Sequence, residues 1–322
     1  MASSTGPRMG WIGLGSMGLG MASNLQKHLS KSRDIPQLTY HNRTMSRGEP
    51  LQTLGASPSE TIRDLVANTD IIFISLSDDA ALSQTLDGLL ADGAAEHLHA
   101  KVIVDTSTVH PDSSIKARDR LAAKGALFVA APVFGASPVA VEGKLLWIMA
   151  GPKIAIEAVS PYILDIMGRK IIQMGEDVRQ SSLLKTAGNF VTAAMMEVVA
   201  EAHVFAEKTG LGDDAMSALF EFQYGPLAHN MSRRLMSGAY IPAPGERPWS
   251  DLRLALKDVA HGVRCAEDAG ARLHVGELAL KHLQEASREE RPLDSSSLYG
   301  VLRRQAGLDF ESDFVKERDG SK

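Results

Sequence analysis

The fold of this chain is decided by the stretch Met9-Gly10-Trp11-Ile12-Gly13-Leu14-Gly15-Ser16-Met17-Gly18. An apolar run typical of a buried strand passes directly into a Gly-x-Gly-x-x-Gly turn, and helical sequence follows it. Gly13 permits the tight turn, Gly15 lets the backbone approach phosphates, and Gly18 lets the helix pack against the sheet. Amide groups at the helix N-terminus then face an anion. The stretch therefore predicts a dinucleotide-binding turn, whose expected cofactor contacts are Gly13, Leu14, Gly15, Ser16, Met17 and Gly18.

A second strand, expected at Leu38 to His41, indicates which dinucleotide binds. NAD sites usually have an acidic residue at the end of this strand, where it accepts hydrogen bonds from the ribose hydroxyls. Here the strand is followed by Asn42, Arg43 and Thr44, with no carboxylate nearby. An arginine pairs with a 2′-phosphate and stacks on adenine, whereas an acid would repel the phosphate. We therefore predict NADP(H) as the cofactor, held in part by these three residues; the alternative is an ordinary polar loop.

Composition limits the classes of function. The chain has 322 residues, enough for two domains, and a formal net charge of -5, which gives no indication of a nucleic-acid or anionic-membrane partner. Cys265 is the only cysteine, so intramolecular disulfides and thiolate metal clusters are excluded, and we expect no metal site. No apolar stretch reaches the length of a membrane span, and the residues before the first strand are too few for a leader. We expect a cytoplasmic protein that acts on a small molecule.

Strand-like and helical segments alternate along the first half of the chain. This alternation predicts an α/β fold with a Rossmann-type, doubly wound, mostly parallel sheet. A helix is expected at Ile154 to Ile166. The expected strands are Met9 to Ile12, Leu38 to His41, Ile71 to Leu76, Val102 to Asp105, Leu127 to Ala130, Leu146 to Ala150 and Ile171 to Met174.

The pattern changes after the last of these strands. From Ser181 to about Lys208 the chain reads as one long helix with a wide apolar stripe, as expected for a helix that joins two domains. Beyond Leu211 only helical patterns follow, and Met216, Phe220 and Phe222 are expected in the core; the alternative for Phe222 to Tyr224 is a part of the substrate wall. We therefore predict a Rossmann domain over residues 1–176, an interdomain helix over 177–209 and an all-α C-terminal domain over 210–322.

Two loops follow predicted strands at the sheet edge where ligands of open α/β sheets bind. In the first, Ser107 and Thr108 are able to donate hydrogen bonds to a substrate carboxylate or a cofactor amide; the alternative is a helix cap before Pro111. In the second, Phe134 precedes Gly135, and the glycine allows close approach of a small ligand; an ordinary turn is the alternative.

The long helix begins with a third candidate. Lys185 and Asn189 are four residues apart, which places both side chains on one helix face. A lysine within an otherwise apolar run needs a partner or a task, although a solvated surface lysine remains the alternative. Gly188 lies between them in a helix interior, where glycine costs about 1 kcal/mol relative to alanine, so close approach to the backbone is expected there.

Taken in order, these motifs resemble the β-hydroxyacid dehydrogenase family, which includes 3-hydroxyisobutyrate dehydrogenase and the tartronate-semialdehyde and succinic-semialdehyde reductases. The resemblance covers nearly the whole chain and implies a Rossmann domain, a long interdomain helix and an α-helical domain that forms homodimers. The matching motifs are Gly13 to Gly18, Asp105-Thr-Ser-Thr, Ala131-Pro-Val-x-Gly, Lys185-x-x-x-Asn189, Leu256-Lys257-Asp258 and Asp294-Ser-Ser-Ser-Leu298.

The resemblance also implies roles for single residues. Lys185 becomes the catalytic acid/base, and Asn189 helps to hold the substrate. Hydride transfer to a carbonyl carbon needs a proton for the forming alkoxide, and lysine, with an ordinary pKa of about 10.4, arrives protonated. We therefore expect carbonyl reduction with NADPH. The remaining expected contacts are Ser107 and Gly135 at the substrate carboxylate, Lys257 at the cofactor and substrate, Asp258 as its orienting partner, and Leu76, Ser77 and Thr108 at the cofactor.

This chain departs from the family beside that carboxylate. Family members usually have Ser-Gly-Gly where this chain has Phe134, Gly135 and Ala136, so a large apolar ring replaces a hydroxyl donor. We therefore predict a larger or more apolar substrate than hydroxyisobutyrate. One alternative is an imine reductase or reductive aminase on the same fold, but those enzymes typically lack a lysine at the position of Lys185. The other is a non-catalytic NADP(H)-binding sensor.

Overall fold

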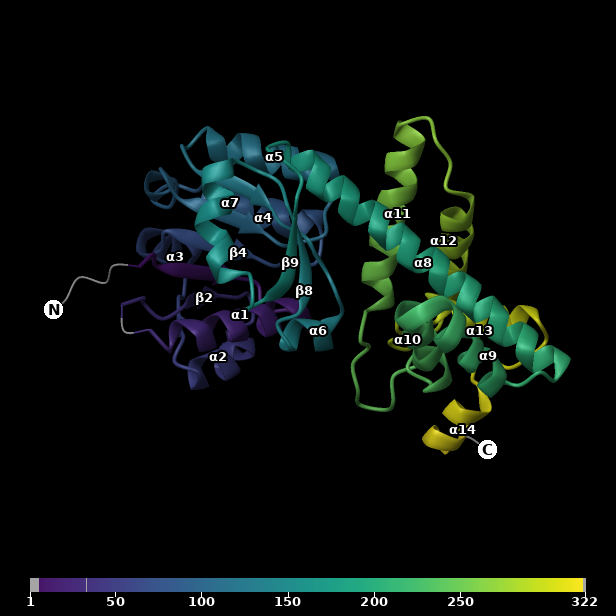
Figure 1. The fold of residues 1–322 in the computed structure, drawn as a ribbon. Helices are drawn as coiled ribbons and strands as arrows, with labels where there is room; N and C mark the ends of the chain where they lie inside the picture. The colour runs from purple at the N-terminus through teal and green to yellow at the C-terminus, as the bar shows by residue number, and fades with distance from the viewer. Residues whose placement is uncertain (1–5, 33, 321–322) are drawn as a thin grey trace. The chain divides into compact units, whose positions relative to one another are not determined.

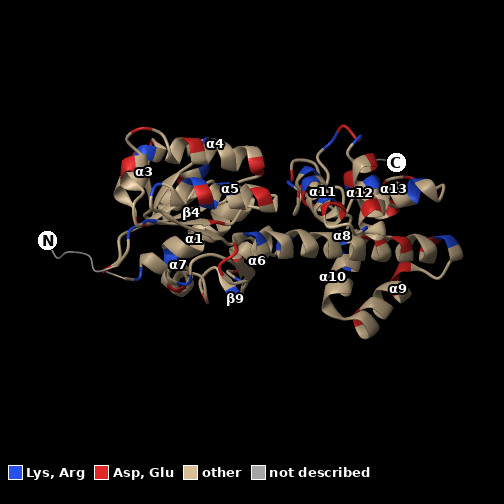
Figure 2. Cartoon of the chain, turned by 90° about the horizontal axis from the view of Figure 1, so that it is seen from above, with Lys and Arg blue, Asp and Glu red and all other residues tan. Residues whose placement is uncertain are grey.

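The computed structural model describes residues 6–32 and 34–320, and the chain divides into two compact units, Met1–Lys185 and Thr186–Lys322 (Figure 1). The division falls inside one long helix, α8 (Val178–Thr209), which begins in the first unit and continues through the second. Basic and acidic side chains are interspersed on both units (Figure 2). Among the residues described, no helix combines the length and the apolar character that a membrane span requires.

The first unit is built on a six-stranded sheet in the order β3-β2-β1-β4-β5-β6, in which every pair of neighbours is parallel. Strand order reverses between β1 and β4, and ligands of such sheets bind outside the carboxyl ends of the strands at that point. The predicted α/β fold is therefore confirmed. The strands are β1 (Met9–Ile12), β2 (Thr39–His41), β3 (Ser57–Pro58), β4 (Ile71–Ile74), β5 (Val102–Asp105) and β6 (Leu127–Ala130).

Helices cover both faces of this sheet, and alternation along the strands feeds two apolar cores. In β4, Ile71 and Phe73 join one cluster of buried side chains, whereas Ile72 and Ile74 join the other. Successive strand residues point to opposite faces, so a strand that is covered on both sides is apolar throughout. The helices of this unit are α1 (Ser16–Leu29), α2 (Glu49–Thr53), α3 (Ile62–Asn68), α4 (Asp79–Leu89), α5 (Pro111–Ala122), α6 (Ser137–Val141) and α7 (Lys153–Val159).

The last strands of the first unit form a separate three-stranded sheet. β8 (Leu145–Met149) pairs antiparallel with β7 (Val133–Phe134) and parallel with β9 (Gly168–Gln173). The sequence predicted β8 and β9 but missed both β7 and the separate sheet. The expected helix at 154–166 was too long: α7 ends at Val159 and a 3-10 turn, Ser160–Tyr162, follows it. Pro161 lacks the amide hydrogen that a continuing α-helix needs.

The described part of the second unit, residues 186–320, is helical, as predicted, and its strand pairing is limited to one bridge between Asp251 and Asp294. Met216 and Phe220 are buried in its core, but Phe222 is 84% exposed, so the expectation for that residue was wrong. Phe222 lies in a π-helical turn, Phe220–Tyr224, which changes the face that the helix presents. The other helices are α9 (Asp213–Leu219), α10 (Gly225–Met236), α11 (Leu252–Asp268), α12 (His274–Ala286), α13 (Leu298–Gln305) and α14 (Asp313–Asp319).

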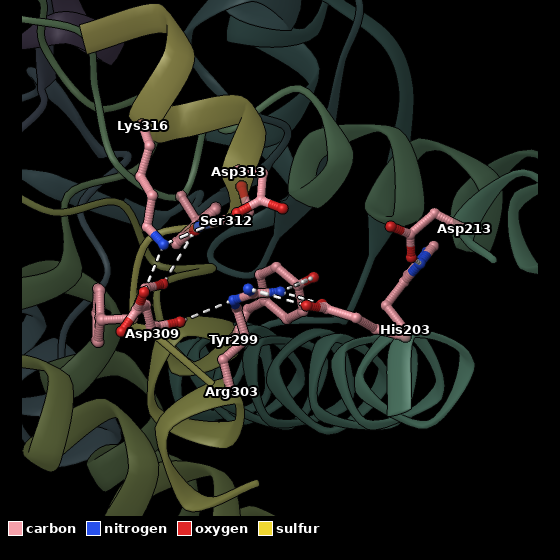
Figure 3. A network of polar contacts seen from close by, with 11 residues as sticks. His203, Asp213, Tyr299, Arg303, Asp309, Ser312, Asp313 and Lys316 are labelled. Atoms are coloured by element: carbon pink, nitrogen blue, oxygen red, sulfur yellow. Dashed lines mark hydrogen bonds and ion pairs between the residues drawn. The ribbon is translucent and has the colours of Figure 1, made fainter. Parts of the chain in front are cut away.

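A buried polar network ties the C-terminal half of α8 to the later helices (Figure 3). Arg303 of α13 is 3% exposed, forms an ion pair with Glu207 of α8 and donates to the backbone oxygen of Asp309 at 2.9 Å. His203, which is also on α8, lies 2.8 Å from both the Asp213 carboxylate and the Ser232 hydroxyl. A buried guanidinium is tolerated only when it is paired and hydrogen-bonded, so this network fixes α13 against α8.

Candidate functional site

The glycine-rich turn between β1 and α1 has three glycines with different surroundings. Gly13 has φ +96°, and a Cβ added to it would lie 2.2 Å from the carbonyl oxygen of Ser75. A Cβ on Gly18 would lie 2.2 Å from the carbonyl oxygen of Gly13. Around Gly15, by contrast, a Cβ would meet no atom within 4 Å. Gly13 and Gly18 are therefore required for the turn to close, whereas Gly15 leaves room for a ligand beside the backbone.

The N-terminus of α1 is suited to a pyrophosphate. Its N-cap is Gly15, so no side chain caps the first amide groups, and its first turn contains no acidic residue. The amide of Leu14 donates to Asn42 Oδ1 at 2.8 Å, which joins the turn to the end of β2. Exposed amide groups and the helix dipole both favour an anion here. The residues present thus fit a dinucleotide pyrophosphate.

The residues after β2 divide into a structural and an exposed part. Asn42 is half-buried, and its amide nitrogen also donates to the Thr44 carbonyl oxygen at 2.7 Å. Arg43 and Thr44 are exposed. No acidic residue stands between Asn42 and Gly48. The fold thus places an exposed guanidinium just after the carboxyl end of β2.

The loops after β4 and β5 are joined by Ser107. The amide of Leu76 donates to Ser107 Oγ at 2.9 Å, and the amide of Ser107 donates to the Asp105 carboxylate at 3.0 Å. A hydroxyl that accepts a hydrogen bond still has its own proton to donate. The cap of α5 is His110, whose Nδ1 accepts from the Asp112 amide at 3.3 Å, so Ser107 and Thr108 do not serve as the cap.

Lys185 and Phe134 meet within the first unit. The Lys185 ammonium lies 4.2 Å from the centroid of the Phe134 ring, and Lys185 is only 8% exposed. Phe134 ends β7 and is half-buried, and the next residue, Gly135, has φ +134° and is exposed. A Cβ on Gly135 would lie 2.6 Å from Leu145 Cδ2. The burial of Lys185 rules out the alternative that it is a solvated surface lysine.

The turn of α8 that precedes Lys185 is anchored by two serines that the sequence analysis missed. Ser181 Oγ donates to the carbonyl oxygen of Ile148 in β8 at 2.8 Å. Ser182 Oγ lies 2.8 Å from Ser114 Oγ in α5, and both serines are buried. They precede Lys185 by four and three residues, a helical spacing on one face that was a usable signal. These two hydrogen bonds therefore hold in place the stretch of helix from which the Lys185 side chain extends.

In the second unit, Asp258 gathers two other predicted residues. Asn189 Nδ2 donates to one Asp258 oxygen at 2.9 Å, and Lys257 Nζ donates to the other at 2.7 Å. α11 lies close to α8 at this point, because a Cβ on Gly262 would lie 3.1 Å from the Thr186 carbonyl oxygen. The side chains of Lys257 and Asp258 are 18% and 19% exposed. This arrangement fixes the amide of Asn189, one turn beyond Lys185.

No metal site accompanies these groups: within the described residues, no three His, Cys, Asp or Glu side chains are grouped so as to hold a metal ion. Together, the first unit offers an anion-binding turn after the parallel strand β1 and a buried lysine beside Phe134 at the end of β7. These are the parts that dinucleotide-dependent proton and hydride chemistry requires.

Comparison with known proteins identifies the family. The sequence profile of the NAD binding domain of 6-phosphogluconate dehydrogenase matches residues 8–175, more than half of the chain. The chain belongs to the β-hydroxyacid dehydrogenase family, which carries this domain. The resemblance predicted from the motifs is therefore confirmed, and this family member has a nicotinamide-dinucleotide binding domain.

Two relatives illustrate the range of the family. The NADH-dependent oxidoreductase ucdB of Aspergillus ustus is 30% identical over 300 residues, which cover 92% of this chain and 99% of that protein. Glyoxylate/succinic semialdehyde reductase 1 of Arabidopsis thaliana is 31% identical over 253 residues, 77% of this chain and 84% of the reductase. Both relatives are thus oxidoreductases: the name of the first states dependence on NADH, and the name of the second states reduction of glyoxylate and succinic semialdehyde.

Solved structures share the fold. A Mycobacterium tuberculosis 3-hydroxyisobutyrate dehydrogenase with L-serine has a TM-score of 0.76 at 20% identity, covering 93% of this chain and 100% of that chain. A Streptomyces aurantiacus imine reductase has a TM-score of 0.60 at 21% identity, covering 92% of this chain and 99% of that chain. At these identities the likeness concerns the fold alone, and dehydrogenases and imine reductases both have it.

Proposed function

We propose that this chain is an NADP(H)-dependent reductase of the β-hydroxyacid dehydrogenase type, which reduces the carbonyl group of a semialdehyde or related compound. The observation that carries this proposal is the buried ammonium of Lys185, held against the Phe134 ring in the unit that contains the dinucleotide turn. The contacts around this side chain hold its ammonium in one place, and proton delivery to a reacting oxygen needs a donor that is held in position.

The choice of NADP(H) is supported by the end of β2. Arg43 is exposed there and no carboxylate is close in sequence, so a 2′-phosphate meets a cation and no repelling charge. A dinucleotide bound at Gly13 to Gly18 supplies the hydride that the reaction needs. Leu76, Ser77 and Thr108, in the loops after β4 and β5, complete the proposed contacts. One relative is NADH-dependent, so cofactor preference is a property that this chain must be tested for directly.

The reaction needs one proton, and the proposed donor is Lys185. As the carbonyl carbon gains a hydride, its oxygen becomes an alkoxide, which takes a proton from Lys185 Nζ to give the alcohol. The lysine then regains a proton from solvent, and in alcohol oxidation the same amine accepts the proton. Asn189 holds the substrate, and its orientation is supported by the hydrogen bond to Asp258, which Lys257 also binds.

The substrate class follows from the residues beside Lys185. Ser107 and Gly135 are the proposed contacts for the acid end of the substrate, because Ser107 follows β5 at the carboxyl edge of the parallel sheet and Gly135 directly follows Phe134, which contacts Lys185. Phe134 is half-buried and places an apolar ring where family members usually have a hydroxyl donor. We therefore propose a carbonyl compound with a larger or more apolar body than a three- or four-carbon semialdehyde.

Self-association belongs to the same proposal. We assign residues 1–176 to the cofactor domain, 177–209 to the joining helix and 210–322 to a domain through which the protein forms a homodimer. The part of α8 within the second unit adds an apolar stripe to this proposed surface: Val191, Val198 and Phe205 recur every seven residues and are 48%, 59% and 59% exposed. Seven-residue spacing is typical of a helix seam that packs against another helix.

An imine reductase is the second candidate. The fold is shared with such enzymes, and the apolar ring of Phe134 suits an apolar amine. Lys185 favours the carbonyl reaction, because an alkoxide needs a proton donor, whereas an iminium ion accepts hydride without one. The two candidates therefore differ in whether turnover depends on Lys185.

The test is NADPH and NADH oxidation by the full chain against a panel of semialdehydes, β-keto acids, bulky ketones and cyclic imines. Lys185→Ala is compared with Lys208→Ala, an exposed lysine on the same helix. We expect ketone or semialdehyde turnover with NADPH, loss of at least 100-fold in kcat for Lys185→Ala, in line with the roughly 10²–10⁴-fold value of an acid/base group, and no change for Lys208→Ala. Turnover of imines alone, or an active Lys185→Ala variant, would favour the imine reductase.

A further inference from the structure

The second unit contains a cavity that none of the proposed catalytic or cofactor residues lines. It has a volume of about 530 Å³, and its lining residues come from α10, from the proline-rich connection that leads from α10 to α11, and from α14. Four arginines and two aromatic residues supply most of the charge and ring surface of its wall. The arginines are Arg233, Arg234, Arg247 and Arg318, and the aromatic residues are Trp249 and Phe314.

Two of the arginines are fixed by the protein. Arg318 donates to the carbonyl oxygens of Gly238 and Ile241 at 3.3 and 3.0 Å and pairs with Asp319 at 2.7 Å. Arg234 donates to the fully buried Asp294 carboxylate at 2.6 Å. Both guanidinium groups are thus held in place before any ligand arrives, which lowers the entropy lost on binding.

The other two arginines, Arg233 and Arg247, are exposed at the cavity. One acidic residue, Glu246, also lines it, so four guanidinium groups meet one carboxylate in the wall. Counting the partners Asp294 and Asp319 as well, four positive charges still exceed three negative ones. The cavity therefore favours an anion, and a guanidinium matches carboxylate, sulfonate or phosphate groups in geometry.

Aromatic rings supply the apolar part of the wall. Trp249 is 51% exposed and Phe314 is 50% exposed, and both line the cavity. The guanidinium of Arg234 lies 5.9 Å from the Trp249 ring centroid. Pockets for small molecules are lined mainly by apolar and aromatic side chains together with a few polar groups that fix the ligand, and this wall contains both kinds.

We propose that this cavity binds a small organic anion with a flat apolar body, such as an aromatic carboxylate, sulfonate or phosphate. Its volume lies within the roughly 300–1,000 Å³ of small-molecule sites. The proposal goes beyond the reductase function, since it uses residues of α10, the connection to α11 and α14, and no residue assigned to the reaction. A ligand here is an accessory ligand of the second unit.

Trp249 provides a direct signal for the test, because Trp11 and Trp147 are fully buried in the first unit. The full chain, saturated with NADP⁺ to block the dinucleotide turn, is titrated with 1-anilinonaphthalene-8-sulfonate while tryptophan emission is followed. We expect saturable quenching that is absent in Trp249→Phe. The uncharged analogue N-phenyl-1-naphthylamine is expected to bind more weakly.

The charge requirement is tested with the double variant Arg233→Gln/Arg247→Gln against Arg264→Gln, an exposed arginine of α11 that does not line the cavity. Loss of two charge-assisted contacts is expected to weaken the probe at least about tenfold in the double variant and not at all in the control. Since both arginines are exposed, the variant is expected to fold, which circular dichroism verifies. Unchanged affinity in the double variant, quenching that survives in Trp249→Phe, or equal binding of the uncharged probe would each overturn the proposal. All of these readouts are independent of turnover.

Discussion

The Lys185 ammonium and the Phe134 ring, 4.2 Å apart, define the site at the scale of single residues. The face of an aromatic ring attracts a cation, by about 2 kcal/mol where both groups are shielded from water. The ring also fixes where the long lysine side chain lies, and the anchored serines of the preceding turn fix where it starts. Phe134 is therefore expected to act on the proposed reaction through Lys185 as well as through the substrate.

Substitution of Phe134 separates these two effects. Phe134→Leu removes the ring face, and we expect kcat to fall about tenfold, in keeping with about 1–2 kcal/mol of cation–π stabilisation, whereas Phe134→Tyr retains the ring and most of kcat. The measurement is steady-state kinetics with the best substrate of the panel. In the Lys185→Ala background, Phe134→Leu is expected to have little further effect on kcat, because both changes remove one interaction. Additive losses would show that Phe134 acts only on the substrate.

At the scale of an element, the glycines of the turn before α1 serve two different purposes, packing and room for a ligand. Gly18 is required by packing, since a Cβ there would press on the Gly13 backbone, whereas Gly15 faces open space with extended φ and ψ of -69° and -176°. The sequence motif alone does not separate these uses. The geometry of strand, turn and helix does, because it shows what each missing Cβ would touch.

The same substitution at these two positions is therefore expected to have opposite consequences. Gly18→Ala should lower the free energy of unfolding by about 1–3 kcal/mol, the usual cost of overpacking. Gly15→Ala should leave thermal unfolding of the free protein unchanged and weaken dinucleotide binding at least about tenfold, because the methyl group occupies the ligand's side of the turn. Thermal melts and dinucleotide titrations distinguish the outcomes. A Gly15→Ala variant that binds NADPH normally would contradict the assignment of this turn.

At the scale of the whole molecule, polar groups buried along α8 hold the second unit together. Glu197 of α8 is 1% exposed, and its carboxylate lies 2.6 Å from His282 Nδ1 of α12. Its other oxygen has no hydrogen-bond partner among the described residues. Burial raises the pKa of Glu197, and Glu201 adds to the rise, while the contact with His282 opposes it. The unit thus contains an acid that its surroundings prefer to keep protonated.

A pH dependence of stability follows. Since the folded state binds the Glu197 proton more tightly than the unfolded state does, this contribution is fully present below the ordinary pKa of 4.5 and is lost as pH rises through the raised pKa. Glu197→Gln keeps the size and a hydrogen-bonding group but does not titrate. We expect the Tm of the wild type to fall relative to Glu197→Gln as the pH rises above 4.5. Parallel profiles of Tm against pH for the two proteins would contradict this sign.

Much of the fold was predictable because it depends on residues that are close together along the chain. Strands such as β1 and β5 were placed correctly by apolar runs bounded by turn residues, and α8 by its long apolar stripe. The predictions failed where contacts between distant residues determine the structure. β7 is a strand only because the chain returns beside it and pairs with it as β8. Phe222 has the spacing of a core residue, but the π-helical turn exposes its side chain. Cofactor preference, the roles of the site residues and the domain limits remain predictions.

The sequence by itself determined the family, the dinucleotide turn and the order of an α/β unit followed by helices, because these depend on residues that are close together along the chain. Only the tertiary structure decided which distant side chains meet: Lys185 with Phe134, Asp258 with Asn189, and Arg318 with the backbone beyond α10. The physical reason is that periodicity and turn chemistry act over a few residues, whereas these contacts form when packing of the apolar cores brings distant segments together.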